Sequence, residues 1–190
     1  MAHHQADHVC PPWIGFFLLA NPLRRLQYTP KTILGAHVAK GMTVIEPGPG
    51  MGFFTLELAR MVGPKGRVVA VDIQARMLEV LRRRAQRRGL LDRLDVRLVM
   101  PGGLGIQDLS AKADFFLAFA MVHEVPDVKR FFNEASASLK AGGKLLFSEP
   151  SGHVSENDFR QSLGLALAAG LRVENEPSIR WSRSALLVKG

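Results

Sequence analysis

Three glycines at alternate positions, Gly48, Gly50 and Gly52, stand between a short apolar run that ends in Glu46 and a segment of helical periodicity. This order is typical of a β-strand that leads into a helix where a small ligand touches the backbone. Glycine fits there because a Cβ atom would block both the tight turn and the close approach of the ligand. The GxGxG spacing differs from the GxGxxG fingerprint of dinucleotide-binding proteins. The turn therefore predicts a small-molecule site of another kind.

The segments that follow complete a strand–helix–strand unit. A helical pattern covers residues 53–62, and a β-branched strand at 67–72 ends in the carboxylate of Asp72. An acidic residue about 20 residues beyond such a turn is placed to accept both hydroxyls of a ribose. The alternative is that Asp72 caps the helix that follows. The glycine turn in the same unit favours the ribose.

Strand and helix patterns alternate along most of the chain. Alternation of this kind predicts a parallel sheet with helices on both faces. We expect one domain over residues 1–190, with an α/β, Rossmann-like, doubly wound and mostly parallel seven-stranded sheet. The predicted strands are 43–46, 67–72, 94–99, 114–119, 143–148, 171–175 and 184–189; the predicted helices are 53–62, 74–88, 127–139 and 156–169, with a C-cap and turn at 141–143 after the third.

Residues 1–40 do not follow this pattern. Prolines break them into short pieces around an apolar patch, residues 13–20. We expect this segment to bury the patch as an N-terminal cap or lid over the carboxyl ends of the strands, where ligands bind in open α/β folds. A plain helix packed on the domain is an equally good interpretation.

The charge of the chain favours an anionic partner. The chain has 25 Lys and Arg residues and 17 Asp and Glu residues, a net charge of +8. Such an excess favours binding to an anionic partner such as RNA. Much of the excess lies in 74–88, where the arginines surround a predicted buried stripe, and a solvated helix face is the simpler interpretation. The stripe consists of Met77, Leu78, Leu81 and Ala85, and the arginines are Arg76, Arg82, Arg83, Arg84, Arg87 and Arg88.

The cysteine content and the hydropathy of the chain indicate the cellular compartment of the protein. The single cysteine, Cys10, excludes an internal disulfide, and no Cys/His spacing predicts a metal site. The longest apolar run, Trp13 to Ala20, is too short to span a bilayer, and it lacks the flanks of a signal peptide. We expect a cytoplasmic protein without a membrane span and without a metal.

The turn from Glu46 to Gly52 resembles motif I of class I S-adenosylmethionine (SAM) methyltransferases, E/DxGxGxG, and Asp72 resembles their acidic strand tip. Residues 113–127 are similar to the fourth-strand exit of the ubiquinone/menaquinone-biosynthesis methyltransferases, and 139–145 to the family's LKPGG+L turn. The four matches stand in the family's order, and the resemblance covers about residues 30–190. It implies the Rossmann-like fold, SAM as cofactor and S-adenosylhomocysteine as product.

The resemblance also implies a cofactor site. Glu46 and the three glycines would contact the methionine part of SAM, Asp72 the ribose, and Ile73 the adenine. Many members place an acidic residue beside the adenine after the third strand, but this chain has a glycine pair there, so backbone groups are expected to recognise the adenine. The predicted cofactor residues are Glu46, Gly48, Gly50, Gly52, Asp72, Ile73, Gly102, Gly103, Leu104, Ala120 and Met121.

Methyl transfer from a sulfonium needs an aligned acceptor and a dry site. A base is needed only if the acceptor loses a proton. His123, at the fourth-strand exit, is the first catalytic candidate; the alternative is a histidine that only hydrogen-bonds neighbouring backbone. Glu149 and His153, after the fifth strand, are further candidates. Glu124 could instead face a helix cap.

Candidates in the N-terminal segment depend on the lid. His8 and Cys10 could reach an acceptor only if residues 1–40 cover the site, and His3 and His4 are expected to belong to a disordered terminus.

The expected function is methyl transfer from SAM to a small molecule. The alternatives are an RNA methyltransferase, motivated by the net charge, and a non-catalytic SAM-binding module. Arsenite methyltransferases use several cysteines, so a single cysteine disfavours that substrate. The segment 118–121 lacks the Asn/Asp-Pro-Pro-Tyr/Phe signature of exocyclic-amine methyltransferases, which disfavours DNA adenine and glutamine. The acceptor and the oligomeric state are not predicted by these patterns.

Overall fold

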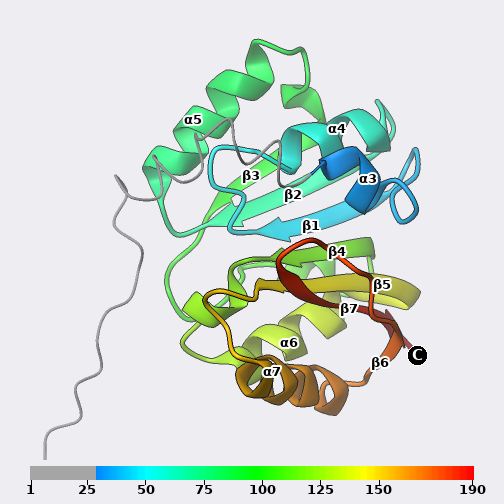
Figure 1. The fold of residues 1–190 in the computed structure, drawn as a ribbon. Helices are drawn as coiled ribbons and strands as arrows, with labels where there is room; N and C mark the ends of the chain where they lie inside the picture. Colours follow the sequence, from blue (N-terminus) through cyan, green and yellow to red (C-terminus); the bar gives the residue numbers. More distant parts are fainter. Residues whose placement is uncertain (1–28) are drawn as a thin grey trace, which may run out of the picture.

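The computed structural model describes residues 29–190 (Figure 1). His3, His4, His8, Cys10 and most of the expected lid lie outside the described residues. Within the described range, no helix combines the length and apolar character needed to cross a bilayer. The elements are α3 (Pro30–Leu34), β1 (Thr43–Pro47), α4 (Thr55–Val62), β2 (Arg67–Asp72), α5 (Ala75–Gln86), η1 (Leu91–Arg93), β3 (Leu94–Leu98), η2 (Gln107–Leu109), β4 (Ala113–Phe119), η3 (Val122–Glu124), α6 (Val128–Ser138), β5 (Leu139–Pro150), α7 (Glu156–Ala168), β6 (Leu171–Asn175) and β7 (Ser182–Lys189).

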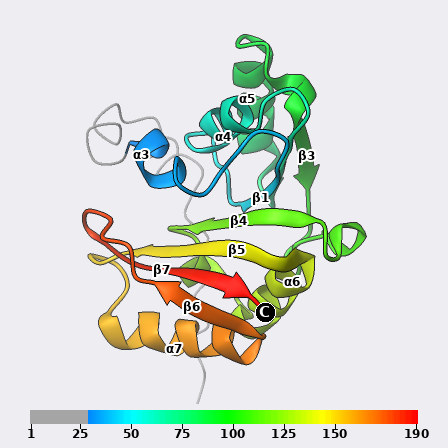
Figure 2. The same cartoon turned by 90° about the vertical axis from the view of Figure 1, so that its right-hand side faces the viewer.

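The strands form one seven-stranded sheet in the order β3-β2-β1-β4-β5-β7-β6. The pairs from β3 to β5 are parallel, and β7 is antiparallel to both of its neighbours. Helices α4 and α5 cover one face, and α6 and α7 cover the other (Figures 1 and 2). This confirms the predicted Rossmann-like, mostly parallel fold. The strand order reverses between β1 and β4, and ligands of such sheets bind outside the carboxyl ends of the strands at this point.

Each face of the sheet carries its own apolar core. On the α5 side the predicted stripe of Met77, Leu78, Leu81 and Ala85 is buried, as the helical spacing requires. On the α6 and α7 side, phenylalanine rings run across the sheet. Phe147 on β5 stacks on Phe159 of α7 with a centroid distance of 4.8 Å and meets Phe132 of α6 edge-on at 5.4 Å. The two cores fix the helices on the sheet and hold its carboxyl edge in place.

The passage from α6 into β5 differs from the prediction. The prediction of a helix C-cap and turn at 141–143 is wrong, because α6 ends at Ser138 and β5 begins at Leu139. Leu139 pairs with Ala113 of β4, and the next pair along the two strands is Phe115 with Lys144. The residues of β5 between Leu139 and Lys144 therefore form an irregularity in that strand. Gly142, with φ of 73°, lies in this irregularity. Helix α4 also starts later than predicted, at Thr55.

Truncation of Phe147 tests the packing on the α7 face. Its side chain is fully buried (0% exposed), so Phe147→Ala should lower the free energy of unfolding by about 3–5 kcal/mol, because it removes burial and leaves a cavity. Leu167→Ala is the control, since Leu167 on α7 is 45% exposed and should change stability by less than about 0.5 kcal/mol. Denaturant unfolding measures both. Equal losses of unfolding free energy in Phe147→Ala and Leu167→Ala would contradict the described packing.

Candidate functional site

The glycine turn joins β1 to α4 at the carboxyl edge of the sheet. Gly48, Gly50 and Gly52 have φ of 63°, 52° and 84°, a region in which residues with a Cβ are strained. The Gly48 N–H donates to the Val71 carbonyl at 2.9 Å, which ties the turn to β2. A Cβ on Gly52 would lie 2.5 Å from Leu81 Cδ1 on α5. The turn is therefore held against β2, and at Gly52 it packs so closely on α5 that a Cβ atom would not fit.

Asp72 ends β2 beside this turn and is 9% exposed. Its carboxylate accepts the Gln74 N–H at 2.9 Å. Burial raises the pKa of Asp72 above its ordinary value, while hydrogen bonds from the backbone of Gln74, Gly50 and Ile73 oppose the rise. Gln74 is the N-cap residue of α5, so Asp72 is not the cap that the alternative interpretation required. The contact with Gly50 places the Asp72 carboxylate against the glycine turn.

The exit of β4 approaches the turn from the other side. A Cβ on Gly48 would lie 3.4 Å from the Cβ of Met121. Ala120 has a left-handed backbone, with φ of 54°, and its N–H donates to the Ser148 carbonyl at 2.7 Å. Strain of this kind, about 1–3 kcal/mol, persists only where the surroundings enforce it. Gly48 and Met121 therefore lie side by side at the turn. Glu46, near the end of β1, is 4% exposed.

The predicted adenine residues lie after β2 and β3. Ile73 is 42% exposed, as a residue that contacts a ligand ring requires. Gly102 has φ of 106°. The Leu104 N–H donates to Glu134 Oε2 at 2.6 Å. That bond occupies the Leu104 donor, so backbone recognition of an adenine here would rest on Gly102 and Gly103.

Two buried polar atoms near the turn were not singled out from the sequence. Gln74 Oε1 and Thr55 Oγ1 are buried and have no hydrogen-bond partner among the described residues. Such an atom costs about 1–3 kcal/mol when unpaired and calls for a ligand or water. Thr55 is the first residue of α4, three residues after Gly52, and Gln74 is the N-cap residue of α5, two residues after Asp72. The polar residue at the N-cap of α5 was the signal that could have identified Gln74.

His123 follows β4 and pairs with Glu149 at the end of β5. His123 Nδ1 lies 2.5 Å from Glu149 Oε2, and the Val122 N–H donates to Glu149 Oε1 at 2.7 Å. The Glu149 side chain is 1% exposed and that of His123 is 30% exposed. The hydrogen bond to Glu149 raises the pKa of His123, although partial burial opposes the rise. A buried carboxylate on Nδ1 holds a proton there and leaves Nε2 to accept one.

Glu124 connects this pair with the glycine-turn side. Its Oε1 lies 3.9 Å from His123 Nε2. Burial raises the pKa of Glu124; the charge of His123 opposes the rise, and the charges of Glu149 and Asp72 add to it. Asp127 caps α6, so Glu124 has no capping role. Three carboxylates and one imidazole therefore share an electrostatic environment at the carboxyl edge.

A cavity of about 240 Å³ adjoins His123. Glu149 and His153 also line it, so the structure brings the three predicted catalytic candidates together. Both oxygens of Glu149 are already bonded, so this residue positions His123. The other lining residues are Val122, Val125, Val128, Val154, Asp158 and Ser162. Within residues 29–190, no three His, Cys, Asp or Glu side chains are grouped as a metal site.

Comparison with known proteins identifies relatives of this arrangement. Residues 39–175 match the family model of a methyltransferase domain. The chain is 30% identical over 155 residues to the ubiquinone/menaquinone biosynthesis C-methyltransferase UbiE of Hahella chejuensis, covering 79% of this chain and 61% of that protein. It is 27% identical over 149 residues to the demethylmenaquinone methyltransferase of a Geobacillus species, covering 78% and 62%. The chain thus spans less than two thirds of the length of these curated relatives.

A solved structure shows the same fold. The crystal structure of a SAM dependent methyltransferase from Aquifex aeolicus matches with a TM-score of 0.79 at 24% identity, over 94% of this chain and 99% of that one.

Titration of His123 tests the geometry of the pair. The pKa of His123 should lie above 6.5, and Glu149→Gln should lower it because the carboxylate that stabilises the imidazolium is removed. Histidine NMR signals, assigned with His123→Gln, measure the pKa. Glu79→Gln on α5 is the control and should leave the pKa unchanged.

The same pair predicts a pH dependence of stability. Because the folded pKa is raised, the contribution of His123 is fully present below the unfolded pKa of about 6.5 and is lost as pH rises through the folded pKa. Glu149→Gln should abolish this part of the dependence. A pKa that is the same with and without Glu149 would contradict the assigned hydrogen bond.

Proposed function

The chain belongs to the class I SAM-dependent methyltransferases, and we propose that it transfers a methyl group from SAM to a small-molecule acceptor that loses a proton. The observation that carries the proposal is the His123–Glu149 pair, which faces a cavity at the same sheet edge as the glycine turn and Asp72. A histidine whose proton position is set by a buried carboxylate is the arrangement that a general base requires.

The donor side fits the family's cofactor. SAM, when bound, supplies an electrophilic methyl group on a positively charged sulfur. Asp72 would accept the ribose hydroxyls, and Gly48, Gly50 and Gly52, which lack a Cβ atom, would let the backbone approach the methionine part. The buried Gln74 Oε1 and Thr55 Oγ1 offer acceptor groups that no described residue uses. These unpaired atoms support a polar ligand at this place.

The carboxylates at the carboxyl edge of the sheet favour the binding of a cationic ligand. Burial is the main cause of the raised pKa of Glu124, the charge of His123 opposes it, and the charges of Glu149 and Asp72 add to it. A partly buried anionic environment attracts a sulfonium more strongly than water does, because the local dielectric is lower. The same residues therefore support both the binding of the donor and the orientation of its charged sulfur.

The acceptor side favours proton removal by His123. Its Nε2 would take the proton while Glu149 stabilises the resulting imidazolium through Nδ1. Relatives in quinone biosynthesis are C-methyltransferases by name, and replacement of a hydrogen on carbon by a methyl group requires loss of a proton from the acceptor. This agreement between the pair and the relatives supports a small-molecule acceptor. His153, on the same cavity wall, would contact the acceptor without holding the proton.

The arginines of α5 bear on the RNA alternative. Arg82 donates to the Val96 carbonyl at 2.7 Å, Arg84 donates to the Met51 carbonyl at 2.5 Å, and Arg83 pairs with Glu79. Half of the arginine cluster therefore makes contacts within the protein, which weakens the argument from net charge. Salt-dependent binding of RNA would support the RNA alternative. Binding of SAM without turnover on any acceptor would support the non-catalytic one.

Removal of the Asp72 carboxylate tests the donor side. Asp72→Ala should weaken S-adenosylhomocysteine binding by about tenfold to a hundredfold, because it removes charge-assisted hydrogen bonds to the ribose. Calorimetric titration measures the affinity, and thermal unfolding checks the fold, since Asp72 also accepts the Gln74 N–H. Asp92→Ala, at an exposed carboxylate in η1, is the control and should bind normally. A folded Asp72→Ala protein with unchanged affinity would show that the ribose lies elsewhere.

Removal of the imidazole tests the acceptor side. With an acceptor found by screening metabolites, His123→Ala should lower kcat by about 10²–10⁴-fold and leave S-adenosylhomocysteine affinity unchanged. In the unaltered protein, kcat/KM should rise with pH through a pKa above 6.5, because the base must be unprotonated. Glu149→Gln should move that inflection to lower pH. Full turnover by His123→Ala would exclude His123 as the base.

A further inference from the structure

The loop that joins β3 to η2, residues 99–106, leaves the sheet beside Asp72. Leu98, the last residue of β3, pairs with Asp72 at the end of β2. Ile73, Leu98 and Met100 are exposed apolar side chains at these two strand ends. Exposed apolar side chains next to a carboxylate that suits a ribose are suited to the flat face of a base. The loop is therefore placed to form one side of a base site.

This loop offers a base its backbone rather than an acidic side chain. Residues 102 and 103 are both glycine, and Gly102 has φ of 106°. Within residues 29–190, no hydrogen bond engages the backbone of Gly102. Backbone groups have no side-chain rotamers with which to adjust, and hydrogen bonds weaken steeply when their angles are poor. Recognition by this loop therefore depends on what holds the loop in place.

Glu134 of α6 holds the loop at this point. Its Oε2 accepts the Leu104 N–H at 2.6 Å, and its Oε1 accepts Arg130 Nε at 2.8 Å. A Cβ on Gly103 would lie 2.8 Å from Arg130 Nη2 and 3.3 Å from Glu134 Oε1, so the Gly103 backbone lies against the pair. The Glu134 side chain is 17% exposed and that of Arg130 is 54% exposed. The more buried carboxylate thus joins α6 to the loop directly beside the two glycines.

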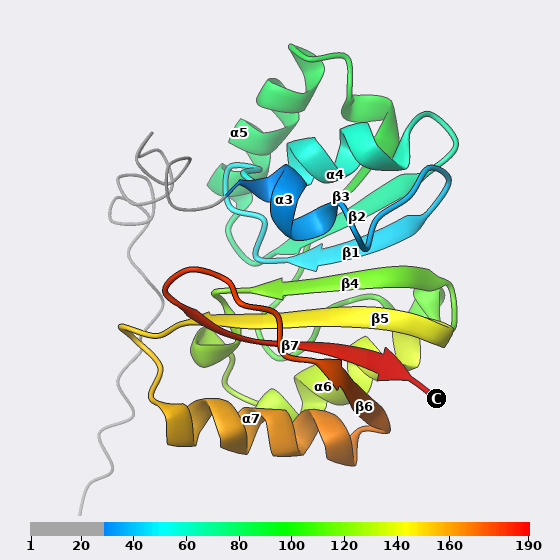
Figure 3. The same cartoon turned by 45° about the vertical axis from the view of Figure 1, so that its right-hand side comes forward.

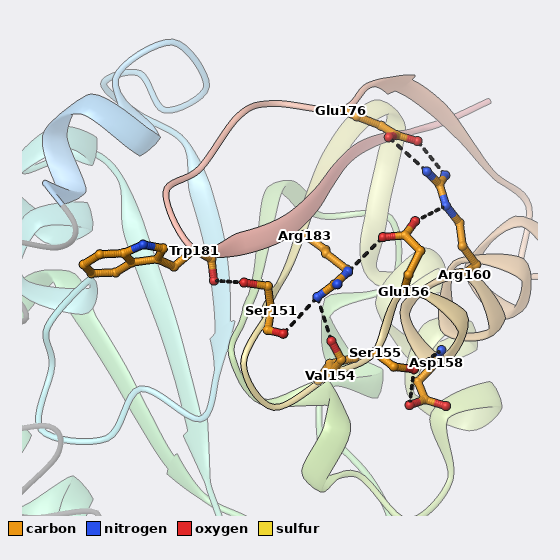
Figure 4. Close-up of polar contacts among 9 residues, drawn as sticks. All are labelled: Ser151, Val154, Ser155, Glu156, Asp158, Arg160, Glu176, Trp181 and Arg183. Carbon is orange, nitrogen blue, oxygen red and sulfur yellow. Dashed lines mark hydrogen bonds and ion pairs between the residues drawn. The ribbon is translucent and has the colours of Figure 1, made fainter.

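An ion pair that only decorates a helix surface is the simpler interpretation. The Arg160–Glu156 pair on α7 has the same spacing of four residues and the same distance of 2.8 Å, and exposed pairs of this kind contribute little to stability. Figure 4 shows that pair in a network of side chains with Arg183 and Glu176. Glu134 differs because its second oxygen accepts a backbone N–H of the loop after β3.

The loop is held from the face of the sheet that lies opposite to α5. Figure 3 shows α6 on one side of the sheet and α5 on the other. Ile73 leads into the N-cap of α5, whereas Glu134 reaches the loop from α6. Leu104 also packs in the same apolar core as Phe131 and Ala135 of α6. The expected base site is thus bounded by residues from both faces.

We propose that Glu134 positions the loop after β3 so that the backbone of Gly102 and Gly103 recognises the adenine of the donor, in place of the acidic side chain that is absent there. Glu134 is then a positioning residue, and Arg130 orients its carboxylate. The inference rests on the proposed function, because it requires the donor ribose at Asp72.

Discrimination between two bases tests the proposal. The probes are S-adenosylhomocysteine and S-inosylhomocysteine, whose base carries an oxygen in place of the amino group and so reverses the hydrogen-bonding pattern of that edge. Calorimetric titration of the whole protein measures both affinities. We expect the unaltered protein to prefer S-adenosylhomocysteine by about tenfold, the range of one or two mismatched hydrogen bonds. Glu134→Ala should lower this preference to about threefold or less, because the loop is no longer held.

Further variants separate the hydrogen bond to the loop from the ion pair. Glu134→Gln retains an oxygen that can accept the Leu104 N–H, so it should keep most of the preference. Arg130→Gln should lower the preference by about twofold, the range of an exposed ion pair. Arg160→Gln is the matched control, since the Arg160 side chain is 51% exposed and pairs with a glutamate four positions away; it should keep the full preference.

The outcomes distinguish a positioning role from a tether that only stabilises the fold. A folded Glu134→Ala protein whose preference is unchanged, including one in which both affinities fall together, would overturn the assignment of Glu134. Arg130→Gln keeps the proposal testable if Glu134→Ala does not fold, because Arg130 is exposed; an unchanged preference there would also count against it.

The proposed function fails in a different way. Asp72→Ala measured on S-adenosylhomocysteine tests the placement of the ribose. Unchanged affinity in that variant would overturn the donor site and with it the assignment of Glu134. Weakened binding in Asp72→Ala together with an unchanged preference in Glu134→Ala would overturn the assignment of Glu134 alone.

Discussion

The glycine turn after β1 has to fit beside β2 and α5 at the point where the strand order reverses, and the site is built around this constraint. The Leu81 side chain leaves no room for a Cβ on Gly52, and the backbone of Gly50 bonds the Asp72 carboxylate. The glycines thus serve two purposes, since they permit the left-handed backbone and they let β2 and α5 come close. Asp72 is positioned by the same turn whose ligand it is expected to bind.

A second interaction connects the proposed donor side to the proposed acceptor side. Glu149 is buried at the end of β5 and bonds both the backbone after β4, at Val122, and the His123 ring. The strained backbone at Ala120 lies directly before this segment. Because β4 lies between β1 and β5 in the sheet, the exit of β4 lies beside the glycine turn on one side and beside Glu149 on the other. One short segment therefore aligns the two halves of the site.

Local patterns predicted the elements well because burial imposes a period on each of them. The stripe from Met77 to Ala85 and the β-branched run of β2 are examples. The start of β5 at Leu139 was missed because it depends on pairing with Ala113, a contact distant in sequence. The hydrogen bond between Glu149 and His123 was also not predicted, since the two residues lie 26 positions apart in the sequence.

We propose that one edge of the sheet holds the donor at the glycine turn and presents it to His123. A crystal structure with bound S-adenosylhomocysteine would test this placement. We expect the ribose hydroxyls within hydrogen-bond distance of the Asp72 carboxylate and the sulfur directed toward the cavity that His123 lines. A ribose placed away from Asp72, or a sulfur directed away from His123, would contradict it.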